Sequence, residues 1–576
     1  MSKLDEPGLE IVADVLVIGG GPAAAWASLA AAEAGANVVV ADKGYLGSSG
    51  AFAASTSGAK VIPPVKELRD PVKFERYALG GHLAVHSWWD RILDITYEKA
   101  PKVYEWGGYD QPMLNGRPAY RGLQGSETMR IMRKQVRKAG VTILDQSPAL
   151  ELLVDGEGAV AGARGLRRQE NLPWTVKAGA IILASGGCAW MSRALGCNTN
   201  TGDGLLMAVE AGGELSGMEF SAHYSLAPLD GPSMTKTAFY RYATYSDKDG
   251  NEIPGLSRNG HRSTSAIARA LLAGPVYCKL DKGTDDPQVV RMLRLSQPNF
   301  FTTYDRLGID PFTQRFQITL SLEGTVRGTG GIRIANRDCG TTVPGLFAAG
   351  DAASRELNCG GFTGGAGPNM TWAIGSGNIA GWAAARHALE LGPRAVARQV
   401  YPVGGAGLVG HEGSFDAARV VKGVQAEVFP FDKNIFRTEA GLTESLHKLN
   451  ELWHEVNQSP AQDSPLQIQR SREAAALVAA ARWSYFAGLE RRETRGMHKR
   501  LDFPLLDPTQ RHYLAVGGLD TLWTRRVPVP EPVVPEPTKA DAAHTYQSPD
   551  LSSLVGAGAG SRSAATTSSD DRRVLV

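Results

Sequence analysis

The chain has 576 residues, and its 61 lysines and arginines nearly balance its 59 aspartates and glutamates, for a net charge of +2 at pH 7. A chain of this length exceeds the size of one hydrophobic core, so two or three domains are expected. Its basic residues are scattered, which excludes the charged footprint of a nucleic-acid-binding or membrane-surface protein. Five separate cysteines without a CxxC pair predict no metal site and no iron–sulfur cluster on this chain.

The N-terminus is short and charged, and it runs directly into an apolar segment. Nothing in it resembles a signal peptide, and the longest apolar region is interrupted by glycines and by Glu33. Together with the odd number of widely spaced cysteines, these features predict a soluble cytoplasmic protein without a membrane span.

The most informative segment is a predicted strand–helix–strand unit near the N-terminus. Val15–Ile18 reads as a buried strand that ends in glycines and passes into an alanine-rich helix. The glycine-rich turn that follows has the spacing of a dinucleotide fingerprint, in which backbone N–H groups and the helix dipole hold a pyrophosphate. The next strand ends at an acid placed to accept hydrogen bonds from a ribose. The predicted contacts of this unit are Gly19, Gly21, Pro22, Ala23, Ala24, Asp42 and Lys43.

Four later segments support a dinucleotide site. A loop of small residues covers 44–58, a hairpin over 149–163 turns at Asp155-Gly156, and a buried strand over 180–187 ends in small residues. A further strand, 344–351, closes on an acid and precedes a helix that is predicted to begin near Asn369. The predicted contacts here are Ser49, Gly50, Ala51, Ser55, Thr56, Ala149, Ala184, Ser185, Gly186, Gly350, Asp351, Asn369 and Met370.

The distant acid and helix favour FAD over NAD. A carboxylate at Asp351 would bond the ribityl hydroxyls, and the helix near Asn369 would direct its positive end at the ring that becomes negative on reduction. An enzyme that binds only NAD does not need this pair, whereas FAD in an extended conformation does.

The order of the motifs resembles the flavoprotein subunits of fumarate reductase and succinate dehydrogenase, with their relatives L-aspartate oxidase and adenylylsulfate reductase. The matching segments are Thr201–Gly204, which adds Asp203 to the predicted cofactor contacts, Met218–Phe220, Ala100–Gly107, Ala348–Asp351, Phe436–Glu439 and Arg492–Pro504. The resemblance implies an α/β fold with a Rossmann-like FAD-binding domain of the glutathione-reductase type, an inserted α+β capping domain and a C-terminal helical domain. The implied divisions are 1–214 and 336–395 for the FAD-binding domain, 215–335 for the capping domain, 396–522 for the helical domain, and 523–576 for a Pro-rich arm and disordered tail.

Two departures from the family pattern concern chemistry. Respiratory members carry a histidine that bonds covalently to the flavin, where this chain has Gly50, as in adenylylsulfate reductase. The resemblance therefore implies non-covalent FAD. The two arginines and the histidine that position a dicarboxylate fall near Thr264, Gly365 and Val326. Because a four-carbon diacid needs fixed cations for its carboxylates, succinate, fumarate and aspartate are expected to be poor substrates.

The candidate catalytic groups are those that remain near the expected flavin. Arg262 and Arg327 could supply positive charge, and His223 or Tyr224 could act as acid or base, with Glu323 nearby. The ordinary alternative for each is a solvated or salt-bridged arginine, or a packed polar side chain.

Two classes of function remain open. One is an FAD-dependent oxidoreductase that acts on a small organic or sulfur-containing molecule at a capped pocket and passes electrons to an external acceptor. The other is a flavin-carrying subunit that works with a separate iron–sulfur or ferredoxin-like protein, as in adenylylsulfate reductase. L-aspartate oxidase is a narrower third possibility, which the missing arginines disfavour.

Overall fold

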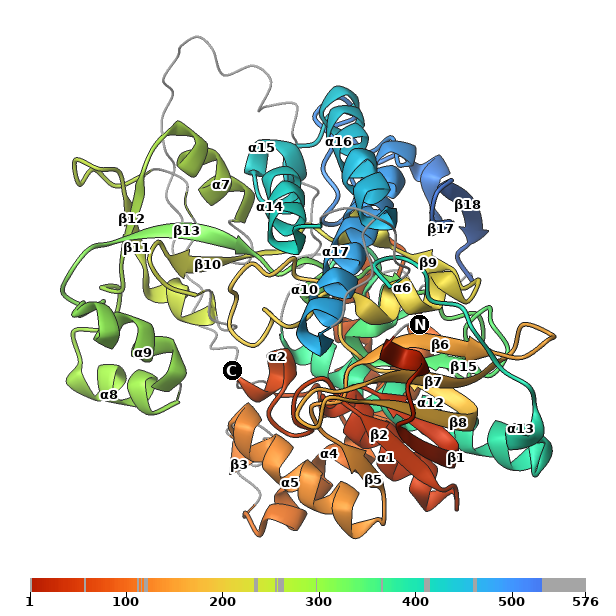
Figure 1. Ribbon diagram of the computed structural model, residues 1–576. Coiled ribbons are helices and arrows are strands. Elements are labelled where there is room, and N and C mark those ends of the chain that lie inside the picture. The colour runs from red at the N-terminus through yellow and green to blue at the C-terminus, as the bar shows by residue number, and fades with distance from the viewer. Residues whose placement is uncertain are drawn as a thin grey trace.

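A computed structural model describes residues 3–55, 58–110, 113–114, 117–118, 123–232, 237–253, 256, 264–296, 298–363, 366–408, 415–458 and 464–530. Its largest unit is a mixed sheet built from β1 (Leu9–Ile18), β2 (Val38–Ala41), β5 (Thr142–Leu144), β6 (Ala149–Val154), β7 (Val160–Arg167), β8 (Leu172–Leu183), β15 (Leu346–Ala348) and β16 (Tyr401–Pro402). The strand order is β16-β6-β7-β8-β1-β2-β5, and β15 also pairs with β8 (Figure 1).

Strand β8 organises this sheet because it is long enough to pair with three neighbours. Along one edge it pairs in parallel with β1, from Leu9 opposite Trp174 to Ile18 opposite Leu183. Its other edge is shared: the first half pairs antiparallel with β7, and the last residues pair in parallel with β15. The carboxyl ends of β1 and β15 therefore lie on either side of the end of β8.

Two long helices, α1 (Pro22–Glu33) and α12 (Ala366–Leu391), pack closely against each other and against this sheet. A Cβ atom at Gly381 would lie 2.3 Å from the Ala27 carbonyl oxygen, so the two backbones approach closer than a side chain allows. The other helices and short strands of this region are α2 (Gly50–Ala53), α3 (Lys66–Leu79), α4 (His86–Gly107), β3 (Met113–Leu114), β4 (Arg117–Pro118), α5 (Gly125–Lys138), α6 (Asp203–Glu210), α10 (Gly324–Arg327), α11 (Glu356–Cys359) and α13 (Arg394–Ala397).

A second, antiparallel sheet projects from the first unit at the left of Figure 1. Its order is β10-β13-β12-β11, and aromatic side chains including Phe300, Tyr304 and Phe316 are buried beneath it. The elements are β10 (Tyr224–Pro228), β11 (Thr244–Ser246), α7 (Thr264–Ala273), β12 (Val276–Lys279), α8 (Pro287–Ser296), α9 (Pro298–Leu307) and β13 (Phe316–Leu322).

The C-terminal part adds helices and completes a third sheet. The helices are α14 (Ala417–Val428), α15 (Phe431–Asn434), α16 (Glu439–Asn457) and α17 (Pro465–Glu490), and the sheet has the order β14 (Gly331–Ile332), β9 (Leu215–Ser216), β17 (His512–Gly517) and β18 (Trp523–Pro528). Helix α17 runs beside the first sheet in Figure 1 and is buried along most of its length. Short 3-10 turns cover Lys3–Asp5, Met218–Phe220, Thr237–Tyr242, Gly350–Ala352 and Pro508–Gln510.

The α/β fold class with a Rossmann-like sheet and a C-terminal helical domain is confirmed. The expected hairpin forms as β6 and β7. Helix α12 begins at Ala366, earlier than predicted, because Pro368 is tolerated in the first helical turn, where its missing N–H is not needed. The beginning of the predicted Pro-rich arm is strand β18, which pairs with β17.

No helix in the described ranges is long and apolar enough to cross a membrane. The exact domain boundaries stay predictions.

The contact between α1 and α12 generates a stability prediction. Gly381→Ala is expected to lower the free energy of unfolding by about 1–3 kcal/mol, because the added methyl group forces the two helices apart. Chemical denaturation followed by circular dichroism measures the change. Gly274→Ala is the control, since its Cβ would have no neighbour within 4 Å. Equal stability of the two variants would contradict the close packing.

Candidate functional site

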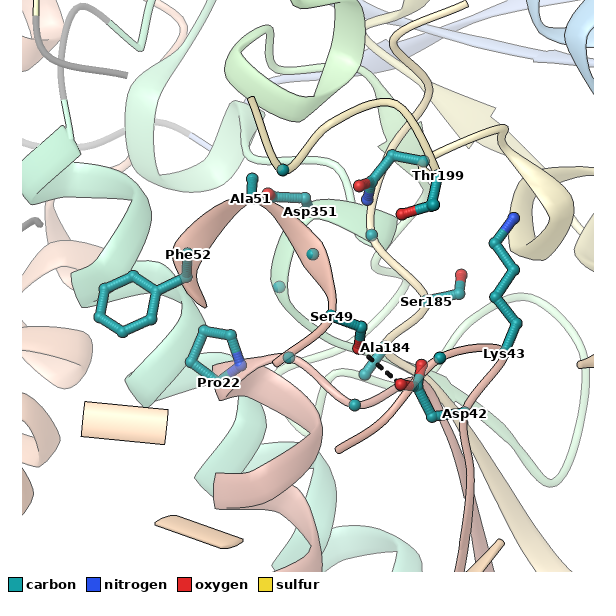
Figure 2. Close-up of a pocket in the computed structure, with 18 of the residues that line it drawn as sticks. Pro22, Asp42, Lys43, Ser49, Ala51, Phe52, Ala184, Ser185, Thr199 and Asp351 are labelled. Carbon is teal, nitrogen blue, oxygen red and sulfur yellow. Dashed lines mark hydrogen bonds between the residues drawn. The ribbon is translucent and has the colours of Figure 1, made fainter. Parts of the chain in front are cut away.

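A cavity of about 580 Å³ opens where the parallel strands of the first sheet end. Its wall contains the residues that directly follow β1, β2, β8 and β15, which is the edge where ligands bind in open α/β sheets. Figure 2 shows several of these side chains around the cavity. The predicted cofactor contacts that line it are Gly21, Pro22, Ala23, Asp42, Lys43, Ser49, Gly50, Ala51, Ser55, Ala184, Ser185, Gly186, Gly350, Asp351, Asn369 and Met370.

Four predicted cofactor contacts do not line the cavity. Gly19 lies against the Ala184 carbonyl, where it lets β1 and β8 approach at their ends. Ala24 is buried in α1, and Ala149 is buried at the start of β6. Asp203 begins α6 and pairs with Lys43 behind the wall. Thr56 lies outside the described residues.

Asp42 is held at the end of β2 by its neighbours. Its Oδ2 accepts a hydrogen bond from Ser49 Oγ at 2.5 Å (Figure 2), and burial raises the pKa of its carboxyl above the usual value, while Ser49 and Lys43 oppose the shift. The glycine turn lies directly against this carboxylate, because a Cβ atom at Gly20 would stand 2.5 Å from Oδ2. An acid in this place can accept hydrogen bonds from ligand hydroxyls in the cavity.

Lys43 ties three distant segments together beside Asp42. Its Nζ donates to Thr201 Oγ1 at 2.7 Å, to Asp203 Oδ2 at 2.8 Å and to Glu473 Oε1 at 2.9 Å. The two carboxylates raise the pKa of Lys43 despite the opposing effect of its burial, which is the largest single influence. Its ammonium group is therefore a fixed positive charge that joins β2, α6 and α17 at the cavity wall.

The opposite end of the cavity contains Asp351 and Arg327. Asp351 forms an ion pair with Arg355, whose guanidinium is fully buried. Burial raises the pKa of the Asp351 carboxyl, and the charges of Arg355 and then Arg327 oppose that shift. This end therefore combines a carboxylate with two nearby guanidinium groups.

The candidate catalytic residues are placed differently from one another. Arg327 lines the cavity, and its Nε lies 3.7 Å from Glu323 Oε2. His223 lies behind it, with Nε2 also 3.7 Å from Glu323 Oε2. Tyr224 points elsewhere, because its hydroxyl donates to the Val428 carbonyl at 2.8 Å and its ring is buried. Arg262 lies outside the described residues.

Sequence reasoning missed several residues of this wall. Arg168 and Gln146 follow two strands of the sheet, and Gln469 and Glu473 come from α17. Arg168 donates to the Lys43 carbonyl at 2.6 Å and to Gln469 at 3.2 Å. For Gln469 and Glu473 the only sequence signal is polarity on a mostly buried helix, and for Arg168 and Gln146 it is a polar residue after a strand. Neither signal specifies what these side chains contact.

Two family descriptions match the chain. Residues 14–107 and 105–228 match the FAD binding domain, and residues 428–525 match the fumarate reductase flavoprotein C-terminal domain. The chain belongs to the fumarate reductase and succinate dehydrogenase flavoprotein family. It is an FAD-dependent oxidoreductase.

Known relatives cover nearly the whole chain of this flavoprotein. L-aspartate oxidase of Mycobacterium tuberculosis is 28% identical over 549 residues, which cover 89% of this chain and 97% of that enzyme. FrdA of Escherichia coli quinol fumarate reductase has a TM-score of 0.78 at 20% identity, with 92% and 99% of the two chains covered. Adenylylsulfate reductase of Archaeoglobus fulgidus gives 0.74 at 18% identity, with 93% and 99% covered. These two structures share the fold of this chain.

The cavity fits an extended FAD. The position beside Gly21 is open, since a Cβ atom there would meet nothing within 4 Å, as backbone approach to a pyrophosphate requires. Four lining side chains have a buried polar atom without a hydrogen-bond partner in the described part of the chain: Arg168 Nε, Ser185 Oγ, Asn200 Oδ1 and Asn369 Oδ1. Buried polar atoms normally have a hydrogen-bond partner in a folded protein. These atoms can therefore form hydrogen bonds with a polar ligand in the cavity.

Gly20 offers a test of the adenosine end of the site. Gly20→Ala is expected to weaken FAD binding by about tenfold, because its methyl group displaces the Asp42 carboxylate. Titration of the apoprotein with FAD, followed by flavin fluorescence, measures the affinity. Gly156→Ala in the hairpin turn is the control, since its methyl group meets nothing within 4 Å. Unchanged affinity in Gly20→Ala would show that Asp42 does not hold the cofactor.

Proposed function

We propose that this flavoprotein is a dehydrogenase that binds FAD without a covalent bond and exchanges electrons between a small organic or sulfur-containing substrate and an external acceptor. The substrate would bind beneath the second sheet and would be neither succinate nor fumarate. The observation that carries the proposal is the cluster of His223, Glu323 and Arg327, of which Arg327 lines the cavity together with Asp351.

The pairing of β10 with β13, followed by α10, places His223, Glu323 and Arg327 close together. Tyr224 in β10 pairs with Leu322 in β13, so His223 and Glu323 are adjacent where the second sheet meets the first unit. The Glu323 N–H donates to the His223 carbonyl at 2.8 Å, which fixes the two backbones together. Arg327 follows on α10, one helical turn after Glu323, and reaches the cavity wall.

The three side chains have complementary roles. FAD, when bound, supplies hydride exchange at its isoalloxazine ring. Arg327 would stabilise negative charge that develops in the cavity, and His223 would hold or release the proton that accompanies the hydride. Glu323 is fully buried between them, and burial raises the pKa of its carboxyl while Arg327 opposes the shift.

Residues at the expected dicarboxylate positions support the exclusion of succinate and fumarate. Val326 is apolar and fully buried, and Thr264 is an uncharged residue that begins α7. Gly365 lies outside the described residues. Arg327 could pair with one carboxylate of a diacid, but the two arginines that bind the diacid in the family are not at their expected positions.

The backbone at Gly50 supports non-covalent FAD. Its φ of +82° lies in the left-handed region, which is strained for a histidine or any other residue with a Cβ atom. The site that carries the flavin-linked histidine in respiratory members is therefore built around glycine in this chain.

The experiment that tests the function is an anaerobic spectral screen of the purified holoenzyme. Sulfur compounds, hydroxy acids and enoates are added in turn, the enoates to enzyme with chemically reduced flavin. Bleaching or reoxidation of the flavin by one class identifies the substrate class. Flavin that responds to none of them, but is reduced when a ferredoxin-like protein is added, would overturn the proposal.

Non-covalent binding leads to a direct prediction. Acid precipitation of the holoenzyme is expected to leave a colourless pellet and a yellow supernatant, because no bond links FAD to the chain. Absorbance of both fractions at the flavin bands measures the distribution. A yellow pellet would refute this part of the proposal.

Arg327 is the second test. Arg327→Met is expected to slow substrate-dependent flavin reduction by about a hundredfold, because the positive charge at the cavity is lost. Stopped-flow spectroscopy with the responsive compound measures the rate. The control is Arg333→Met, at the residue that follows β14, whose side chain pairs with Glu214 at 3.1 Å. Equal rates in the two variants would remove Arg327 from the chemistry.

The similarity to L-aspartate oxidase supports a second candidate. It covers 89% of this chain at 28% identity, although the dicarboxylate arginines are missing. Hydrogen peroxide released when aspartate is added in air would favour this activity over the first proposal.

A separate iron–sulfur or ferredoxin-like protein is the acceptor we propose for the electrons. All five cysteines are buried and unpaired, and no cluster of three metal-ligating side chains occurs in the described ranges. Unpaired buried thiols also fit the reducing cytoplasm, where we place the protein. Copurification with a short cysteine-rich chain would support this arrangement.

A further inference from the structure

Arg355 connects the cofactor acid to the turn that carries Arg327. Its guanidinium pairs with Asp351 Oδ1 and donates to the carbonyl groups of α10 and the residue after it: Thr325 at 2.7 Å, Val326 at 3.2 Å and Gly328. The Arg355 backbone N–H also donates to the Thr329 carbonyl at 2.8 Å. The side chain is fully buried, so water cannot replace these contacts.

Other contacts hold the turn to different parts of the protein: the Glu323 N–H donates to the His223 carbonyl at 2.8 Å, and the Thr329 N–H donates to the Phe220 carbonyl at 3.1 Å. On the far side, Thr325 Oγ1 accepts a hydrogen bond from the Cys188 N–H at 2.7 Å, and the Thr325 N–H donates to the Cys188 carbonyl at 3.0 Å. Thr363 Oγ1 donates to the Arg327 carbonyl. These contacts attach α10 to the protein core, but only Arg355 attaches it to Asp351 among the described residues.

We propose that Arg355 is a positioning residue. It fixes Asp351, the acid expected to bind the ribityl hydroxyls, and the α10 turn that carries Arg327 in place relative to each other. The catalytic importance of placing Arg327 rests on the proposed function. The effect of Arg355 on FAD binding does not rest on it. FAD affinity and the placement of Arg327 then depend on the same guanidinium fork. Lysine could keep the charge but could not reach Asp351 and three carbonyl groups together.

The test measures two properties that need no substrate: FAD affinity of the apoprotein, and the flavin midpoint potential from titration with indicator dyes. Arg355→Lys is expected to weaken FAD binding by about tenfold through the lost hydrogen bonds. Arg355→Met is expected to weaken it further and to shift the potential negatively, because the Asp351 charge is no longer balanced. If Arg355→Met does not fold, Arg355→Gln replaces it, since it also removes the charge and should shift the potential in the same direction.

The matched control is Arg500→Lys. Arg500 is also fully buried, and its guanidinium pairs with Asp502 at 2.8 Å and donates to the Gly488 carbonyl at 3.0 Å, away from the cavity. It is expected to lower the unfolding temperature without changing FAD affinity or potential. If Arg355→Lys behaves in the same way, Arg355 is only structural and the proposal is overturned.

A double-mutant cycle tests the link to Arg327. Arg355→Lys is also expected to shift the flavin potential, because the turn that carries the Arg327 charge loses its attachment, and this shift is expected to be much smaller in an Arg327→Lys background. Additive shifts would overturn the link. A failed substrate screen would refute the proposed function while leaving both of these measurements intact.

Discussion

The parallel pairing of β8 with β1 on one edge and β15 on the other is the constraint on which the site depends. Each of these strands ends at the cavity, so their registers determine where the glycine turn and Asp351 stand relative to each other. The close contact between α1 and α12 reinforces the same alignment, since α1 begins just after β1 and the first turn of α12 contributes Asn369 and Met370 to the cavity wall. A shift of one residue in either pairing would move one half of the cofactor site away from the other.

Buried charged side chains connect other parts of the chain to this arrangement of strands and helices. Lys43 connects β2 with α6 and α17, and Arg355 connects Asp351 with α10. Arg495 acts similarly between the C-terminal segment and the first unit, since it pairs with Glu493 and donates to the Gly81 carbonyl. Breaking one partner of a buried pair is costly because the other charge remains buried, so these links specify the arrangement of segments more than they add stability.

The parts of the site that follow local rules could be predicted from the sequence. The glycine turn, Asp42 and Asp351 are each specified by a strand end, and the structure brings them to one cavity. Gln469, Glu473 and Arg355 could not be found in this way, because their role depends on packing between segments far apart in the chain. The same limit explains why Tyr224 is wrongly predicted to face the cofactor. Its hydroxyl donates to the Val428 carbonyl of α14, and no local sequence pattern links these two residues.

The position of the catalytic candidates follows from where the second sheet joins the frame. Strands β10 and β13 bring His223 and Glu323 to the junction, and α10 continues from Glu323 to Arg327 at the cavity. The segments that follow the second sheet therefore carry the proposed catalytic groups, while the first unit carries most of the predicted cofactor contacts. Any movement of the second sheet would reach the cavity through α10, whose carbonyl groups Arg355 holds against Asp351. In this arrangement Asp351, a predicted cofactor contact, also limits through Arg355 how far α10 can move.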